Sequence, residues 1–296
     1  MKFGQHDPAH HTLIHISDTH LLAGDALLGG EYDTRANLAA MLDRVERIEG
    51  ASALVITGDL TDLGEPDAYR ALKAMVDPVA TRMGIPVIWI AGNHDERPEM
   101  RRDLLGDDPS QQPIRHAFDL DGLRLIALDS TVPGWHHGRI DDDQLAWLRA
   151  ELETPAPHGT ILALHHPPLP SHVPMFDILE LQNQQALAEA IRVSDVRAIL
   201  AGHLHYSMSG TFAGVPTHVA AASCYTMDVA RPSRRVNGMD AGQSFHLVHV
   251  YEDQVTSTVV PVAAADPGEF FTPEWYAQLE TMTADERLEF FSRKRG

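Results

Sequence analysis

The sequence predicts an α/β protein organised around a mixed β-sheet. Over residues 12–91, short apolar runs alternate with longer amphipathic stretches, which is the β-α-β-α-β order of a parallel sheet. The apolar runs are nearly continuous, as in strands that are covered on both faces. From residue 206 onward the apolar runs follow one another closely, which predicts a second, more antiparallel sheet.

Three early apolar runs are expected to form strands, at 12–17, 53–57 and 86–91. The stretch 34–48 has apolar residues at helical spacing, so we expect a helix between the first two strands. The stretch 65–83 opens with a Glu-Pro pair, which suits the first turn of a second helix.

The middle of the chain begins with a hairpin. Asp121-Gly122 is a strong hairpin turn signal, and it lies between apolar runs 115–120 and 123–128. Beyond it we expect helices at 141–152 and 178–193, and strands at 160–164, 197–201, 206–212, 215–220, 245–251 and 254–260.

Composition limits the partners and the location. Lys and Arg number 23 and Asp and Glu 42, so the net charge of −19 argues against nucleic-acid binding. The single Cys224 fits a reducing cytoplasm. No run reaches the ~18 apolar residues of a transmembrane segment, and residues 1–11 lack the apolar centre of a signal peptide.

Polar side chains that can bind metal ions follow five expected strands at the point where each strand ends. They are Asp18 and His20, Asp59, Asn93, His165, and His203 and His205. In α/β sheets the crevice outside the carboxyl ends of the strands is where ligands bind. One such position would mean little, but five together predict a single site.

The chemistry of this set is specific. It contains two carboxylates, one amide oxygen and four imidazoles, which is more than one tetrahedral ion needs. Such donors suit two ions of the Fe, Mn, Zn or Co type, with one carboxylate shared between them. No cysteine takes part, so a structural zinc site with thiolate ligands is excluded.

Five motifs contain these residues: Asp18-x-His20, Gly58-Asp59-x-x-Asp62, Gly92-Asn93-His94-Asp95, His165, and Gly202-His203-x-His205. In order and spacing the chain resembles the calcineurin-like metallophosphoesterases, and among them the class III cyclic-nucleotide phosphodiesterases of actinobacteria. The resemblance implies a four-layer αββα sandwich of two mixed β-sheets flanked by helices. It covers residues 12–262 as one domain, with a flexible tail at 1–11 and a helical C-terminal appendage at 263–296.

The resemblance also assigns the metal ligands. It implies that one ion is held by Asp18, His20, Asp59 and His205, and the other by Asp59, Asn93, His165 and His203. Asp59 would then bridge the two ions. The implied pair is Fe and Mn, and Zn, Co or Ni are alternatives because the same ligands accept them.

The same pattern implies roles in catalysis. His94 would face the phosphate and the leaving group, and Asp62 would orient that histidine. His20, Asn93 and His205 would complete the substrate-binding set with His94. A hydroxide bridging the metals would attack phosphorus while His94 protonates the departing alkoxide.

The implied function is a dinuclear-metal phosphodiesterase that hydrolyses 3′,5′-cyclic nucleotides, notably cAMP, and also 2′,3′-cyclic nucleotides and aryl phosphodiesters. Two alternatives remain open: a glycerophosphodiester phosphodiesterase, and a metal-dependent effector, associated with the cell envelope, whose hydrolysis is incidental. Similar proteins dimerise, so a homodimer is a further expectation. The Gly- and Arg-rich loop 226–243 has no assigned role.

Several other residues have simpler explanations. His136 and His137 lie in the run PGWHHG, which is either a solvated turn or a contact to substrate or to another subunit. His166 precedes two prolines, which suggests that it shapes a loop. Cys224 lies in an apolar run and is expected to be a small buried hydrophobic residue.

Overall fold

Five strands form a first sheet in the order β13-β12-β1-β2-β3 in the computed structural model, which describes residues 4–263 and 271–294. They are β1 (His11–Ile16), β2 (Ala53–Thr57), β3 (Val87–Ile90), β12 (Ser244–Val250) and β13 (Val255–Pro261). The first three are parallel because the helices α1 (Thr34–Val45) and α2 (Pro66–Met83) return the chain between them. β12 and β13 add antiparallel strands beside β1.

Six strands form a second sheet in the order β4-β5-β6-β7-β9-β8. They are β4 (His116–Leu120), β5 (Leu123–Ala127), β6 (Thr160–Ala163), β7 (Val196–Ala201), β8 (Met208–Phe212) and β9 (Val215–Val219). The predicted hairpin joins β4 and β5, and both its turn residues have positive φ, 56° at Asp121 and 93° at Gly122. The expectation that the strands after residue 206 form a sheet of their own is wrong, because β12 and β13 extend the first sheet and β8 and β9 the second.

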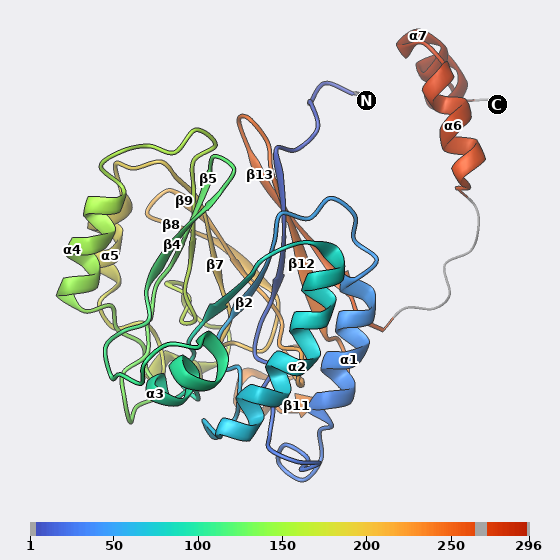
Figure 1. Cartoon of the computed structure of the whole chain (residues 1–296). Coiled ribbons are helices and arrows are strands. Elements are labelled where there is room, and N and C mark those ends of the chain that lie inside the picture. Colours follow the sequence, from blue (N-terminus) through green and yellow to red (C-terminus); the bar gives the residue numbers. More distant parts are fainter. Residues whose placement is uncertain (1–3, 264–270, 295–296) are drawn as a thin grey trace. The chain divides into compact units, whose positions relative to one another are not determined.

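Apolar side chains fill the space between the two sheets, where Leu13 and its neighbours meet Leu125 and its neighbours. α1 and α2 cover the outer face of the first sheet. α4 (Asp142–Glu151) and α5 (Gln184–Ile191) cover the outer face of the second sheet (Figure 1). This is a four-layer αββα sandwich, and it confirms the predicted fold class.

One predicted helix begins later than expected. The stretch 178–193 becomes helical only at Gln184, after a 3₁₀ turn at Pro174–Ile178. The intervening residues pair instead with the loop before α4: Leu181 forms a bridge with Gly138, and the side chain of Asn183 bonds to the backbone of Ile140. These tertiary contacts outweigh the helical spacing of the apolar residues.

Short elements complete the description. α3 (Arg97–Glu99) continues into a π-helical turn at Met100–Leu105, and β10 (Thr226–Met227) pairs with β11 (Gly238–Met239) across the loop 226–243. Residues 10–263 make up one unit. The described residues 271–294 belong to another and contain α6 (Pro273–Thr281), α7 (Ala284–Arg287) and a π-helical turn at Leu288–Ser292. No helix among the described residues is long and apolar enough to cross a bilayer.

Candidate metal centre and active site

The seven expected donors all follow the carboxyl ends of parallel strands. Asp18 and His20 follow β1, Asp59 follows β2, Asn93 follows β3, His165 follows β6, and His203 and His205 follow β7. Of the described residues other than glycine, seven have positive φ, and five of them are expected ligands: Asp18, His20, Asp59, His203 and His205. Such strained backbone persists where the surrounding structure holds it in place, which is typical of functional sites.

Two glycines allow the loops at the strand ends to meet. A Cβ atom on Gly92 would lie 2.0 Å from the backbone nitrogen of Asp59. A Cβ atom on Gly202 would lie 1.9 Å from the Oγ of Ser17, which precedes Asp18. Gly202 and Ser17 belong to loops of different sheets. Only a residue without a Cβ atom allows these two loops to approach each other so closely.

The first group of donors consists of Asp18, His20, Asp59 and His205, whose ligand atoms lie within 4.8 Å of one another. The Nε2 of His20 is 3.4 Å from the Oδ2 of Asp59, and the Nε2 of His205 is 3.5 Å from the Oδ1 of Asp18. All four side chains are buried. The group matches the expected ligand set of one metal ion.

The second group shares Asp59 with the first. The Nε2 of His165 lies 3.3 Å from the Oδ2 of Asp59 and 3.1 Å from the Oδ1 of Asn93. The ring of His203 is 5.1 Å from that of His165, centroid to centroid. His165 also bonds through Nδ1 to the backbone oxygen of Thr57 at 2.7 Å, which directs its Nε2 toward the other donors.

These donors fit metal ions. The Nε2 atoms of His20 and His203 are both buried without a hydrogen-bond partner, which is costly unless something else binds them. Nitrogen and carboxylate donors without a thiolate suit ions such as Fe, Mn and Zn. A dinuclear site with Asp59 between the two groups would satisfy these two nitrogen atoms.

The pKa values of the donors are shifted by burial and by the neighbouring carboxylates. Burial alone would lower the pKa of His20, but the carboxylates of Asp59 and Asp62 raise it to about 10. Burial would also lower the pKa of His165, but the carboxylates of Asp59 and Asp18 raise it to about 9. Burial raises the pKa of Asp18 to about 6. Divalent ions bound among these carboxylates would displace the protons that the imidazoles hold.

His94 lies beside these donors but is bonded differently. Its Nδ1 donates to the backbone oxygen of Asp62 at 2.8 Å, and its backbone N–H donates to the Oδ1 of Asp59 at 2.8 Å. The carboxylate of Asp62 accepts from the Nδ1 of His20 at 2.9 Å and lies 3.5 Å from His94. Asp62 thus bonds to His94 through its backbone and to His20 through its side chain, and the Nε2 of His94 has no hydrogen-bond partner among the described residues.

Asp95 is a supporting residue that the sequence analysis did not assign. Its buried carboxylate accepts hydrogen bonds from the backbone N–H groups of Leu60 at 3.0 Å and Gly92 at 2.9 Å, and from the hydroxyl of Tyr69 at 2.9 Å. It therefore ties the loop after β2 to the loop after β3. Its place in the Gly-Asn-His-Asp motif was the available signal.

His136 and His166 support Asn93. The Nδ1 of His136 lies 3.0 Å from the Nδ2 of Asn93, and by accepting from that amide it directs the Oδ1 of Asn93 toward His165. The Nε2 of His166 bonds to the backbone oxygen of His136 at 3.1 Å, and its Nδ1 to the hydroxyl of Ser130 at 2.8 Å. Burial lowers the pKa of His166 to about 3, so this residue is a neutral support.

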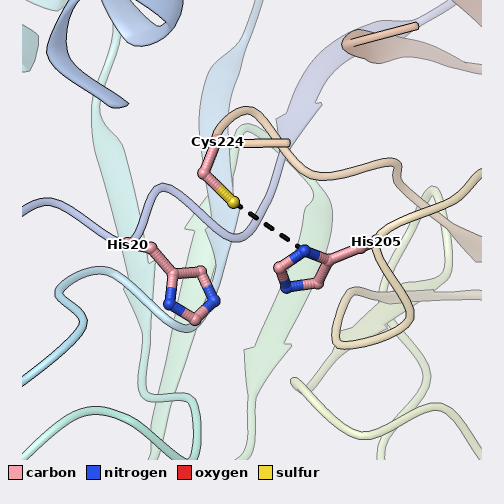
Figure 2. A group of neighbouring side chains, drawn as sticks. All are labelled: His20, His205 and Cys224. Carbon is pink, nitrogen blue, oxygen red and sulfur yellow. Dashed lines mark hydrogen bonds between the residues drawn. The ribbon is translucent and has the colours of Figure 1, made fainter. Parts of the chain in front are cut away.

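Cys224 lies behind the first group of donors. Its Sγ is 3.8 Å from the Nδ1 of His205, and Figure 2 shows the thiol and the two imidazoles of His20 and His205 gathered together. The three could hold a metal ion by their spacing. Burial raises the pKa of the thiol, which keeps Cys224 protonated, and the sequence alone indicated only the buried position.

A cavity of about 280 Å³ opens above the donors. Its polar lining residues include Asp59, Asn93, His94 and His136. The uncharged lining residues, which we call the apolar wall, are Leu28, Met175, Phe176, Leu179, Tyr225 and Met227. The cavity thus combines charged and uncharged side chains.

Residues 11–207 match the calcineurin-like phosphoesterase family. Two curated relatives are similar over most of their length. One is the cAMP/cGMP dual specificity phosphodiesterase of Mycobacterium tuberculosis, 47% identical over 92% of this chain and 86% of the relative. The other is a probable cyclic nucleotide phosphodiesterase of Rhodococcus erythropolis, 51% identical over 86% of this chain and 84% of the relative.

More distant proteins are also similar. The glycerophosphodiester phosphodiesterase of Enterobacter lignolyticus is 32% identical over 65% of this chain and 70% of its own length. Among solved structures, a dimetal phosphatase from Danio rerio superposes with a TM-score of 0.61 at 17% identity, covering 87% of this chain and 98% of that one. At 17% identity this structural similarity supports the fold alone.

Proposed function

This chain belongs to the calcineurin-like phosphoesterase family, and we propose that it hydrolyses 3′,5′-cyclic nucleotides, cAMP among them, to nucleoside 5′-monophosphates. The membership confirms the resemblance inferred from the motifs. The observation that carries the proposal is the gathering of Asp59 and six further metal-binding side chains beside a cavity of substrate size. The identities of 47% and 51% to relatives named as cyclic-nucleotide phosphodiesterases support the substrate class.

We assign two metal ions to the site, Fe and Mn as the proposed pair. Asp18, His20, Asp59 and His205 would hold one, and Asp59, Asn93, His165 and His203 the other. When bound, such ions supply a nucleophile from water near neutral pH and stabilise charge on the phosphate. The protein supplies the positions, since hydrogen bonds to Thr57 and Asp62 fix which nitrogen of His165 and His20 faces the ions.

His94 is the proposed general acid. Its Nδ1 is committed to the backbone of Asp62, so its free Nε2 belongs to the cavity that His94 lines. Hydrolysis breaks the bond between phosphorus and the ribose 3′ oxygen, and that oxygen must gain a proton as it leaves. Protonated His94 would donate this proton, and the same N–H would bind a phosphate oxygen beforehand together with the groups of His20, Asn93 and His205.

The competing substrates are less well supported. The glycerophosphodiester phosphodiesterase is a more distant relative, at 32% identity, than either cyclic-nucleotide phosphodiesterase. Hydrolysis of 2′,3′-cyclic nucleotides and aryl phosphodiesters at the same site remains part of the proposal. The catalytic domain at 12–262, the homodimer and the cytoplasmic location with a possible envelope association stay predictions.

A comparison of four substrates tests the proposal. We expect kcat/KM with one defined metal to be higher for cAMP than for glycerophosphocholine, with measurable turnover of 2′,3′-cAMP and a nitrophenyl diester. Faster turnover of glycerophosphocholine than of cAMP would favour the glycerophosphodiester alternative. Slow turnover of every diester with tight binding of product would favour the effector alternative.

A further inference from the structure

A layer of buried polar side chains lies between the apolar core and the metal-binding residues. Leu13 of β1 and Val55 of β2 belong to the core between the two sheets. Because side chains alternate along a strand, His15 and Thr57, each two residues further along, face the same space, and so does Ser17 after β1. These three polar residues are fully buried. Polar groups at such a depth are stable only when hydrogen bonds satisfy them.

The three residues form a chain of hydrogen bonds that ends at a metal-binding histidine. The Nε2 of His15 lies 2.8 Å from the Oγ1 of Thr57, and the Thr57 hydroxyl donates to the Oγ of Ser17 at 2.8 Å. The Ser17 hydroxyl donates to the backbone oxygen of Thr57 at 3.1 Å. The same oxygen accepts from the Nδ1 of His165 at 2.7 Å. The backbone oxygen of Thr57 therefore links His165 to the chain of hydrogen bonds.

The direction of these hydrogen bonds determines which nitrogen of His15 carries hydrogen. A hydroxyl can donate only one hydrogen. Because Thr57 donates to Ser17, its Oγ1 must accept from the Nε2 of His15. The Nδ1 of His15 has no hydrogen-bond partner among the described residues. Burial lowers the pKa of His15 well below its usual value, so the ring is neutral and its Nδ1 carries no hydrogen.

We propose that three residues act as positioning residues for His165, namely His15, Ser17 and Thr57. They hold the backbone oxygen of Thr57 where it keeps the hydrogen of His165 on Nδ1 and leaves Nε2 for the metal ion. This inference rests on the proposed function, because it concerns a ligand of the metal centre that the function requires. Groups that bond to the second nitrogen of a metal-binding histidine fix its tautomer and its orientation.

The tautomer of His15 tests the chain of hydrogen bonds without any metal ion. In ¹⁵N NMR spectra of the metal-free, full-length protein at pH 7, we expect neutral His15 with its hydrogen on Nε2. A hydrogen on Nδ1, or on both nitrogens, would overturn the inference. In Thr57→Val, which has nearly the same shape but lacks the hydroxyl, we expect His15 to lose this single tautomer, whereas Thr57→Ser should retain it.

Calorimetric titration with Mn²⁺ tests the consequence for the metal centre. We expect the unaltered chain to bind two ions, and Thr57→Val to weaken one of the two binding steps about tenfold and the other step less. Thr57→Ser keeps the hydroxyl and should restore most of the affinity. A purely structural defect would weaken both steps alike, or would lower thermal stability and leave both steps unchanged, and either result would overturn the inference.

Thr217→Val is the matched control, because Thr217 is equally buried and lies in β9 of the second sheet, where its hydroxyl donates to the backbone oxygen of Val215 at 3.4 Å. It should change neither the Mn²⁺ binding steps nor the tautomer of His15. A loss of Mn²⁺ affinity as large as that in Thr57→Val would also overturn the inference. Failure of the proposed function would look different, since Mn²⁺ would bind and His15 would show the expected tautomer while cAMP remained unhydrolysed.

Discussion

Two pairs of buried histidines, His20 with His165 and His15 with His246, differ in the direction of their pKa shifts. At the strand ends, neighbouring carboxylates raise the pKa of His20 to about 10 and that of His165 to about 9, whereas burial lowers the pKa of the other two histidines there, His203 and His205. In the interior, burial lowers the pKa of His246 to about 4 and that of His15 well below its usual value. All four side chains are buried, so burial alone does not separate them.

The partners of each imidazole explain the difference. His20 bonds to the carboxylate of Asp62, whereas His15 bonds to the hydroxyl of Thr57 at 2.8 Å. His246 lies 2.9 Å from the hydroxyl of Ser257, and its ring meets that of His15 edge-on at 5.7 Å. A hydroxyl does not stabilise a buried cation as a carboxylate does. The comparison teaches that contact with a buried carboxylate, more than burial itself, decides which imidazole gains a higher pKa, as in His20 and His165 beside Asp59.

Removal of the shared carboxylate should have the largest effect. Asp59 contacts both groups of donors, so Asp59→Ala should lower kcat/KM by more than about 10³-fold, beyond the ~10–100-fold typical of outer-shell partners. Metal analysis should show loss of both ions. His205→Ala, which removes a proposed ligand of one ion only, should be less damaging, and equal losses in the two variants would contradict the proposed bridging role of Asp59.

The next effect concerns the free nitrogen of His94. His94→Ala should lower kcat on cAMP by about 10²–10³-fold while both metals remain bound. Because nitrophenolate leaves without much help from a proton, turnover of a nitrophenyl diester should fall less. Rates on both substrates and the metal content are the measurements. A mutant that loses a metal, or that slows equally on both substrates, would exclude the role of general acid.

The interior group predicts a dependence of stability on pH. The folded protein keeps His246 neutral down to about pH 4, whereas the unfolded chain takes up a proton near pH 6.5, so acid favours unfolding. This contribution is lost as the pH falls from 6.5 to 4 and is constant outside that window. From pH 7 to pH 5 it should cost about 2 kcal/mol of the free energy of unfolding.

Urea unfolding of the unaltered chain and of His246→Asn at both pH values measures this contribution, since the variant lacks the titrating group. His15 and His218 stay in both proteins, so the difference measures His246 together with the part of the His15 shift that His246 causes. The unaltered chain should lose the larger free energy on acidification. An equal loss in both proteins would show that His246 does not set this pH dependence.

A smaller effect is expected at the support of Asn93. His136→Leu removes the acceptor for the amide of Asn93, so the affinity for the metal that we assign to Asn93 should fall about 10–100-fold. His136→Gln offers a carbonyl oxygen to the same amide and should retain more of the affinity. His137→Ala, next in the chain and half-buried, serves as the control. Unchanged metal affinity in His136→Leu would exclude this positioning role.

The donors could be predicted from the sequence because their positions follow a local pattern. Each follows an apolar strand, and parallel strands bring such positions to one edge of a sheet. Asp18 and His203, 185 residues apart, meet for this reason, and the backbone N–H of His203 lies 3.1 Å from the Oδ1 of Asp18. The layered fold followed from the resemblance, since apolar periodicity alone indicated only a mixed sheet.

The remaining parts of the site depend on contacts that no local pattern encodes. His136 reaches Asn93 across 43 residues of sequence, from a loop that also reads as a solvated turn. Phe176 and Met175 lie in a 3₁₀ turn just before a stretch that was predicted to be helical from residue 178. Tertiary packing decides both, so only the structure shows the apolar wall and the support of Asn93.

The central claim is that two metal ions bound around Asp59 make this chain a phosphodiesterase. The direct test removes all metal with a chelator, verifies its absence by elemental analysis, and then adds Mn²⁺ in steps while cAMP hydrolysis and bound metal are measured on the same sample. We predict no activity without metal, and recovery that is complete only when two ions are bound per chain. Full activity in the metal-free protein, or complete recovery at one ion per chain, would contradict the account.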